Sequence, residues 1–272
     1  FLNLLKKRIT AKSMSKEIVV NSTYSTDIRE IECAINNFSD NQDYLVKGSR
    51  NSIKKLRLEN GEICTIKAFK IPNFINKIVY RFFRESKAKR SYTHAKILIE
   101  KGFKTPTPIA YVENKTAITF LDSYYFCAFI KEDFTYREVV HTPNFPDMEN
   151  VLRQFTQFTF ALHQAGIEFL DHSPGNTLIF DKKDGTYEFY LVDLNRMKFH
   201  DSMTLEQRIN NFVRLTPHRE SVEIMAKEYA RLMQLPPAEV IDKMWAGTEK
   251  FQQKFHLKQV RKKRLKKLIG KE

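Results

Sequence analysis

Three polar residues in the second half of the sequence have the types and spacing that phosphoryl transfer requires. Asp171 is followed five residues later by Asn176, and Asp193 follows an apolar segment after the turn signal Asp184-Gly185. Phosphoryl transfer needs a carboxylate that orients the attacking hydroxyl and accepts its proton, and oxygen ligands that hold Mg²⁺ on the phosphates. The spacing therefore predicts Asp171 as the catalytic base, with Asn176 and Asp193 as Mg²⁺ ligands.

Each of these residues also has an ordinary structural interpretation. Asp and Asn beside Pro174-Gly175 are common turn formers, and Asp193 could cap a helix. The joint pattern favours function, because an amphipathic helix ends near His163, the Asp–Asn pair follows, and a hairpin then delivers Asp193. We expect His163 to be a buried histidine that holds this loop, whereas His172 could contact the acceptor or lie in solvent.

The segment from His163 to Arg196 resembles the kinase-like lipopolysaccharide kinases, which phosphorylate Kdo or heptose of the lipid A–core glycolipid. Asp193-Leu194-Asn195-Arg196 is similar to that family's Mg²⁺ motif. Pro174-Gly175-Asn176 is also similar to aminoglycoside and choline kinases, so this loop alone does not identify the acceptor. The resemblance covers most of residues 44–200 and implies a protein-kinase-like fold with ATP and Mg²⁺ as cofactors.

The resemblance further implies a strand lysine that holds the α- and β-phosphates. Lys67, at the end of Cys64-Thr65-Ile66-Lys67, stands where that lysine is expected, although a solvated surface lysine is the alternative. The loop that begins with Gly48 and Ser49 would cover the phosphates through its backbone N–H groups, or it is an ordinary turn.

Two departures from the kinase pattern weaken the resemblance locally. Residues 89–96 contain no acidic residue to pair with the lysine, and Phe169-Leu170 replaces the usual His-Arg before the catalytic Asp. The second departure fits a glycolipid or small-molecule kinase that lacks an activation-loop switch. The first leaves open a pseudokinase that binds nucleotide without turnover.

The elements that position these residues follow from hydrophobic periodicity and turn signals. Strands are expected over residues 43–47, 53–58, 63–69 and 109–130, and a helix over 73–101. The sequence is mostly helical from Met148, with breaks at Pro217 and Pro236-Pro237. Segregated strands and helices indicate an α+β fold in two lobes, a small antiparallel-sheet N-lobe and a mostly helical C-lobe. The expected divisions are a possible extension over 1–20, the N-lobe over 21–130 and the C-lobe over 131–272, which ends in a basic helix.

Composition and charge limit the partners. The 272 residues carry a net charge of +14, of which residues 254–272 contribute +8 and residues 76–90 contribute +5. Both segments interleave cations with apolar residues, which suits an anionic membrane surface, whereas no nucleic-acid motif is present. Three scattered cysteines (Cys33, Cys64 and Cys127) favour a reducing compartment without disulfides or zinc. No apolar run approaches the roughly 18 residues that a membrane span needs.

Together these features predict a Mg²⁺–ATP-dependent phosphotransferase acting on a sugar hydroxyl of a lipopolysaccharide precursor, with Kdo of Kdo–lipid A as the expected acceptor. The alternatives are a kinase of a protein or small metabolite, and a nucleotide-binding pseudokinase at the membrane surface. The expected location is cytoplasmic, peripheral on the inner face of the cytoplasmic membrane. An anionic glycolipid and the membrane surface are the expected partners, and nucleic acid is not.

Overall fold

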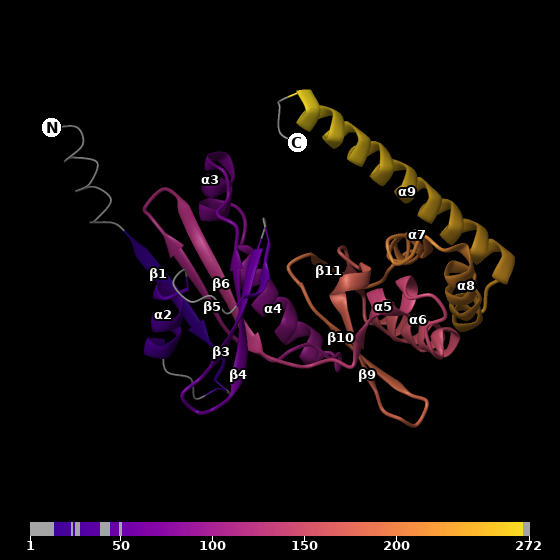
Figure 1. The fold of residues 1–272 in the computed structure, drawn as a ribbon, viewed down its shortest axis with the longest axis horizontal. Coiled ribbons are helices and arrows are strands. Elements are labelled where there is room, and N and C mark those ends of the chain that lie inside the picture. Colours follow the sequence, from indigo (N-terminus) through magenta and orange to yellow (C-terminus); the bar gives the residue numbers. More distant parts are fainter. Residues whose placement is uncertain (1–13, 23, 25–27, 39–43, 49–50, 269–272) are drawn as a thin grey trace. The chain divides into compact units, whose positions relative to one another are not determined.

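The computed structural model describes residues 14–22, 24, 28–38, 44–48 and 51–268 (Figure 1). The chain divides into two compact units. Unit 1 comprises the residues up to Lys131 together with Asp193–Arg196, and unit 2 comprises Glu132–Val192 and the residues from Met197 onward. The short segment that contains Asp193 therefore belongs to unit 1, although it lies between two parts of unit 2 in the sequence.

Unit 1 is built on a six-stranded antiparallel sheet with the order β1-β5-β6-β4-β3-β2. Its strands are β1 (Ser15–Val20), β2 (Tyr44–Lys47), β3 (Asn51–Arg57), β4 (Ile63–Phe69), β5 (Pro108–Lys115) and β6 (Phe120–Ala128). The turn between β3 and β4 lies between the strands expected over residues 53–58 and 63–69, and in it Gly61 has φ +86° and the Glu62 N–H donates to Asn60 Oδ1 at 2.9 Å. Strand β1 begins before residue 21, within the segment expected to precede the N-lobe.

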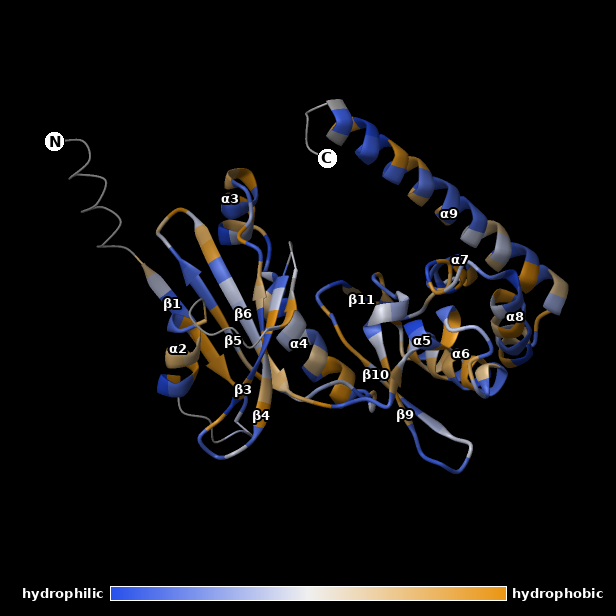
Figure 2. Ribbon diagram, in the orientation of Figure 1, coloured by the Kyte–Doolittle hydropathy of each residue, from blue (hydrophilic) through white to orange (hydrophobic). Residues whose placement is uncertain are grey.

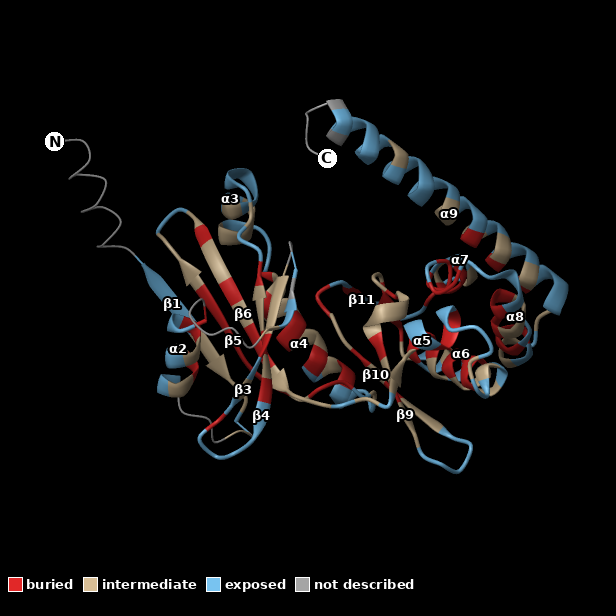
Figure 3. Cartoon of the chain, in the orientation of Figure 1, coloured by how far each residue is buried: buried red, intermediate tan, exposed pale blue. Residues whose placement is uncertain are grey.

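Two helices cover opposite faces of this sheet. Helix α2 (Ile28–Asn36) packs Ile31 and Ile35 into a cluster that includes Ile66 of β4. Helix α4 (Lys87–Glu100) packs Ala88 and Tyr92 against Phe69. Alternate residues of a strand face opposite sides, so Ile66 and Phe69 direct the two clusters to different faces. Figure 3 shows the buried residues of α4 and of the strands in red.

The prediction of one helix over residues 73–101 is wrong in one respect, because the structure has two helices there. Helix α3 (Phe74–Phe82) begins after Asn73, whose Oδ1 accepts the Asn76 N–H at 3.0 Å. Helix α4 begins after Ser86, whose Oγ accepts the Lys89 N–H at 3.0 Å. Asn and Ser at these positions are favourable N-caps, so a second helix start interrupts the continuous apolar periodicity.

Unit 2 is mainly helical and holds two small antiparallel ladders, β10-β9-β7 and β11-β8. Its helices are α5 (Tyr136–His141), α6 (Met148–Gln164), α7 (Leu205–Asn210), α8 (Arg219–Met233) and α9 (Pro237–Leu268). Its strands are β7 (Phe134–Thr135), β8 (Ile167–Phe169), β9 (Thr177–Asp181), β10 (Tyr187–Leu191) and β11 (Met197–Phe199), with a 3₁₀ turn at Pro174–Asn176. The core gathers fully buried aromatic side chains, including Tyr136, Phe155 and Tyr229.

Helix α9 begins at Pro237, as the Pro-Pro pair predicted. Its first half is fixed by buried Val240, Met244 and Thr248, whereas Phe255 and Leu257 further along are at least half exposed. Figure 2 shows mostly hydrophilic residues along this second half. None of the helices in the described part of the chain combines the length and hydrophobicity needed to cross a bilayer.

Candidate functional site

Unit 1 brings Lys67 and Asp193 into an ion pair, although 126 positions separate them in the sequence. Lys67 Nζ lies 2.7 Å from Asp193 Oδ1, and the lysine side chain is only 13% exposed. Strand β4 fixes Lys67 because it pairs with β3 on one side and with β6 on the other, where Lys67 lies opposite Tyr125. A lysine paired in this way is not a solvated surface lysine.

Asp193 is held in an uncommon backbone conformation. Its φ is +60°, in the left-handed region, which Asp and Asn tolerate better than most residues. Its Oδ1 also accepts a hydrogen bond from Asn195 Nδ2 at 2.6 Å. Strained residues of this kind cluster at active sites, where the surrounding structure determines their conformation.

Helix α4 holds the Asp193 segment through two side chains that sequence reasoning missed. Arg90 Nη1 donates to the carbonyl of Asn195 at 2.8 Å, and His94 Nδ1 donates to the carbonyl of Leu194 at 2.7 Å. Burial lowers the pKa of His94, which favours its neutral form. Arg90 and His94 are four residues apart and share one face of α4, a spacing that could have been noticed in the sequence. The helix therefore supports the Asp193 segment with an arginine and a histidine.

Unit 2 contains the loop with Asp171 and Asn176. Asn176 Nδ2 donates to the backbone carbonyl of Asp171 at 2.8 Å, so this bond does not engage the amide oxygen. The Asp171 carboxylate is part-exposed, and its Oδ1 lies 3.4 Å from Nη1 of Arg214, which sequence reasoning also missed. The Val192 N–H donates to the Asn176 carbonyl at 3.0 Å, and Asp193 is the next residue in the chain.

A buried polar network anchors this loop to the helices of unit 2. His163 is 1% exposed, and its ring lies 2.8 Å from the Tyr229 hydroxyl and 3.3 Å from Asn211 Oδ1. Asn211 Nδ2 in turn donates to the carbonyl of Phe169 at 3.1 Å, two residues before Asp171. Since the Asn211 oxygen can only accept, Nε2 of His163 carries the proton and Nδ1 accepts from Tyr229. His163 is thus the buried structural histidine that the sequence predicted.

His172 is buried, so its ring is open neither to an acceptor nor to solvent, contrary to both interpretations of the sequence. Its ring is 1% exposed and packs against Phe155 and Phe169, with centroid distances of 5.3 and 5.5 Å. Among the described residues neither ring nitrogen has a partner in hydrogen-bond geometry, although the nearby Asn211 backbone slightly favours the charged form. Burial dominates and lowers the pKa of His172 to about 3.

We predict that His172 is one cause of acid destabilisation. Its folded pKa is about 3 and that of His163 is about 4, against 6.5 for a free histidine. Both depressed pKa values contribute stability that is fully present above about pH 6.5 and is lost as the pH falls to about 4 for His163 and to about 3 for His172. At pH 5 one such group costs about 2 kcal/mol. Urea denaturation measures the free energy of unfolding at pH 7.5 and at pH 5. The decrease in this free energy between the two pH values should be smaller in His172→Leu than in the native chain by about this amount.

Thr159→Val provides the matched control, because Thr159 is buried and its hydroxyl has no partner in the described part of the chain, but it does not titrate. This variant should keep the native difference between the two pH values. An equal pH dependence in the native chain and in His172→Leu would show that His172 has no such role.

The phosphate-covering loop is only partly described. The Gly48 N–H donates to the carbonyl of Asn51 at 3.1 Å, which closes a turn between β2 and β3. Ser49, the other expected nucleotide contact in this loop, lies outside the described residues. The assignment of both residues to phosphate binding stays a prediction.

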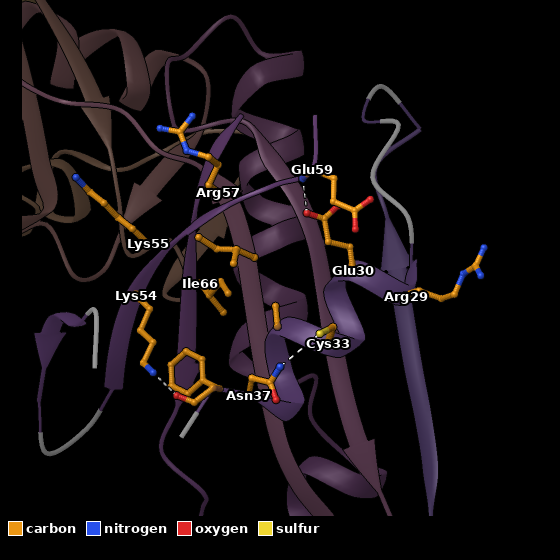
Figure 4. Close-up of a pocket in the computed structure, with 12 residues that line it drawn as sticks. Arg29, Glu30, Cys33, Asn37, Lys54, Lys55, Arg57, Glu59 and Ile66 are labelled. Carbon is orange, nitrogen blue, oxygen red and sulfur yellow. Dashed lines mark hydrogen bonds between the residues drawn. The ribbon is translucent and has the colours of Figure 1, made fainter. Parts of the chain in front are cut away.

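A groove of about 670 Å³ lies elsewhere in unit 1, between α2 and strands β3 and β4 (Figure 4). Its lining includes Glu30, Cys33, Lys55 and Ile66, and none of the predicted site residues. Ile66 and Lys67 are neighbours in β4 and face opposite sides of the sheet. The groove is therefore on the face away from the Lys67–Asp193 pair.

The donor chemistry of Asn176 and Asp193 suits Mg²⁺. The ion prefers oxygen ligands and is usually held by one or two carboxylates together with substrate phosphates and water. Within the described ranges no group of three or more His, Cys, Asp or Glu residues is placed to hold a metal by itself. Each of the two residues offers an oxygen ligand of the kind that Mg²⁺ takes.

Comparison with known proteins places this geometry in a recognised fold. No protein-family profile matches the sequence, and no curated protein matches it. The structure is similar to that of WaaP in complex with acyl carrier protein, with a TM-score of 0.56 and 13% identity over 88% of this chain and 97% of that one.

Two further kinase structures share weaker likeness. The Rio2 kinase ADP/Mg²⁺-phosphoaspartate complex from Chaetomium thermophilum has a TM-score of 0.45 and 14% identity, covering 90% of this chain and 75% of that one. The MAP kinase LmaMPK10 from Leishmania major has a TM-score of 0.39 and 14% identity, covering 74% and 60%. The fold assignment rests on the likeness to WaaP, which extends over both units. The chain thus has the predicted α+β, protein-kinase-like fold.

Proposed function

We propose that the protein is a phosphotransferase that moves the γ-phosphoryl group of Mg²⁺-bound ATP onto a sugar hydroxyl of a lipopolysaccharide precursor. The observation that carries this proposal is the Lys67–Asp193 ion pair, which α4 supports through Arg90 and His94. The pair places a cation that could bind phosphates beside a carboxylate that could bind Mg²⁺, and phosphoryl transfer uses both.

The chain's own residues divide the reaction between them. Asp171 orients the acceptor hydroxyl and accepts its proton while the acceptor oxygen bonds to the γ-phosphorus and the bond from that phosphorus to the β,γ-bridging oxygen breaks. Asn176 and Asp193 would hold Mg²⁺, which supplies positive charge against the phosphate oxygens. Lys67 binds the α- and β-phosphates, and Arg214 beside Asp171 adds a cation on the acceptor side.

The acceptor is proposed from the resemblance of the Asp193-Leu194-Asn195-Arg196 motif to lipopolysaccharide kinases, with Kdo of Kdo–lipid A as the expected substrate. The likeness to WaaP supports the kinase-like fold on which this proposal rests. The basic segments 76–90 and 254–272 suit an enzyme that works at an anionic surface. We accordingly propose a peripheral position on the inner face of the cytoplasmic membrane.

The test is ADP release from Mg²⁺–ATP in the presence of Kdo–lipid A, with lipid A that lacks Kdo as the matched acceptor. We expect Kdo–lipid A, but not lipid A without Kdo, to stimulate ADP release. We expect no stimulation after Mg²⁺ is chelated. Stimulation by lipid A alone, or by an aminoglycoside or a protein instead, would reject Kdo as the acceptor. Nucleotide binding without release under every condition would identify a pseudokinase.

A further inference from the structure

Helix α3 is a surface helix in which no side chain is buried. Large apolar side chains around it are exposed, with Phe83 at 82% and Ile75 at 73%. We use the name α3 patch for seven such residues, Ile71, Phe74, Ile75, Ile78, Phe82, Phe83 and, on the turn between β5 and β6, Ile118. Figure 3 shows α3 without any buried residue, and Figure 2 shows hydrophobic residues on it.

Specific contacts hold this helix with its apolar side outward. Tyr80 packs on Phe120 of β6 with ring centroids 5.7 Å apart, and Arg81 Nε donates to the carbonyl of Thr116 at 3.0 Å. Phe74, Ile78 and Phe82 recur every four residues, so they form one stripe along the helix. Helical geometry puts Tyr80 on the opposite side from this stripe. The exposed stripe is therefore a consequence of how α3 is attached to the sheet.

The charge around the patch indicates what covers it. Residues 70–84 contain Lys70, Lys77, Arg81 and Arg84 and no acidic residue. The Arg81 guanidinium lies 5.2 Å from the ring of Phe82. Apolar side chains on one face and cations beside them are the signature of a helix that lies in the interface of an anionic bilayer. A second copy of this chain would instead bring like charges together.

A pocket beside α3, lined by both apolar and polar side chains, is consistent with the same partner. It has a volume of about 360 Å³, and its lining includes Lys70, Asn73, Asn76 and Lys87. Phe69 also lines it and connects it to the ion pair, since Lys67 Nζ and Lys87 Nζ lie 5.4 and 5.9 Å from the centre of its ring. Two ammonium groups and two amides provide donors for the phosphate of a lipid head group.

We propose that α3 is a membrane-docking helix whose apolar patch inserts at the head-group boundary of an anionic bilayer. Lys77 and Arg84 then lie at the level of the lipid phosphates. The inference deepens the proposed function, on which it rests for the acceptor's location, because it names the element that holds the enzyme at the surface carrying its acceptor.

The first test measures co-sedimentation of the full chain with vesicles of phosphatidylcholine and phosphatidylglycerol, without nucleotide or acceptor. We expect Ile75→Ser/Phe83→Ser to weaken binding by about tenfold or more. Leu45→Ser/Ile99→Ser removes exposed apolar side chains of unit 1 outside the patch and should bind like the native chain. Native-like binding by the α3 variant, or a loss seen only with Phe255→Ser/Leu257→Ser on α9, would overturn the proposal.

A second measurement reads insertion directly and does not depend on loss of binding. Trp245 is the single tryptophan, so Phe83→Trp in a Trp245→Phe background places one fluorophore on the patch. Its emission should shift to shorter wavelength with anionic vesicles and should be quenched by brominated lipid. An unchanged spectrum, or a shift that depends only on protein concentration and so reports self-association, would contradict insertion.

These experiments separate the inference from the proposed function. If the chain binds vesicles through α3 but never releases ADP, the proposed function is contradicted and the proposal of a docking helix is supported. If the chain phosphorylates the acceptor but does not bind anionic vesicles, the proposed function is supported and the docking helix is contradicted.

Discussion

Asp193→Asn is expected to lower the rate of phosphoryl transfer by about a thousandfold while the chain stays folded. Replacing the carboxylate by a neutral amide removes the negative charge that binds Mg²⁺ and several kcal/mol of transition-state stabilisation, and about 4 kcal/mol corresponds to this factor. Asn is the informative substitution, because it accepts the left-handed φ of +60° at this position, whereas Ala would add backbone strain. The hydrogen bond from Asn195 can also persist.

The measurement is steady-state turnover across a Mg²⁺ titration, together with the free energy of unfolding. Because the Lys67–Asp193 pair is partly exposed, we expect stability to change by less than about 2 kcal/mol. Asp201→Asn, in an exposed turn before α7, provides the control and should keep native turnover. Native turnover in Asp193→Asn would remove the metal assignment.

The second large effect is on stability, and we expect it from Gly166→Ala. Gly166 follows α6 with φ +73°, and a Cβ built there would lie 1.9 Å from the carbonyl oxygen of His200. The clash is with backbone, which is itself fixed by the His200 N–H bond to the Gly166 carbonyl at 2.8 Å. Backbone strain and a forced shift together should lower the free energy of unfolding by about 3–5 kcal/mol.

Gly185→Ala separates the two causes. Gly185 has a similar φ of +84°, but no atom lies within 4 Å of the position of its Cβ. This variant carries the conformational strain alone and should lose about 1–2 kcal/mol in the same urea titration. Equal losses of unfolding free energy in the two variants would show that the His200 carbonyl oxygen does not lie close enough to Gly166 to clash with an added Cβ.

Much of the fold was predictable because its signals are local. The hairpin at Gly61, the end of α6 at Gly166 and the start of α9 at Pro237 each depend on residues next to one another in the sequence. Helix α2 and strand β1 were missed, since short elements carry weak periodicity and depend on the sheet they pack against. The boundary between α3 and α4 was missed because the apolar pattern continues across the caps.

Some residues of the candidate site could be predicted from the sequence and others could not. Asp171, Asn176 and Asp193 follow from spacing along the chain, and their catalytic roles stay predictions. Arg90 and His94 were not found, because their partners are backbone carbonyls of residues about 100 positions away. The four-residue spacing shows that the two side chains share a face of the helix, but carbonyl groups leave no trace in side-chain patterns, so the partners of Arg90 and His94 are visible only in three dimensions.

The most direct test of the proposed activity measures transfer of the γ-phosphate to the acceptor. The protein is incubated with Mg²⁺ and ATP labelled at the γ-phosphate, and label on Kdo–lipid A is measured for the native chain and for Asp171→Asn. We expect labelled glycolipid with the native chain and a loss of about a hundredfold or more in the variant, because the variant lacks the general base. Equal labelling by the two proteins would contradict the role of Asp171, and no label on any acceptor with the native chain would contradict the proposed activity.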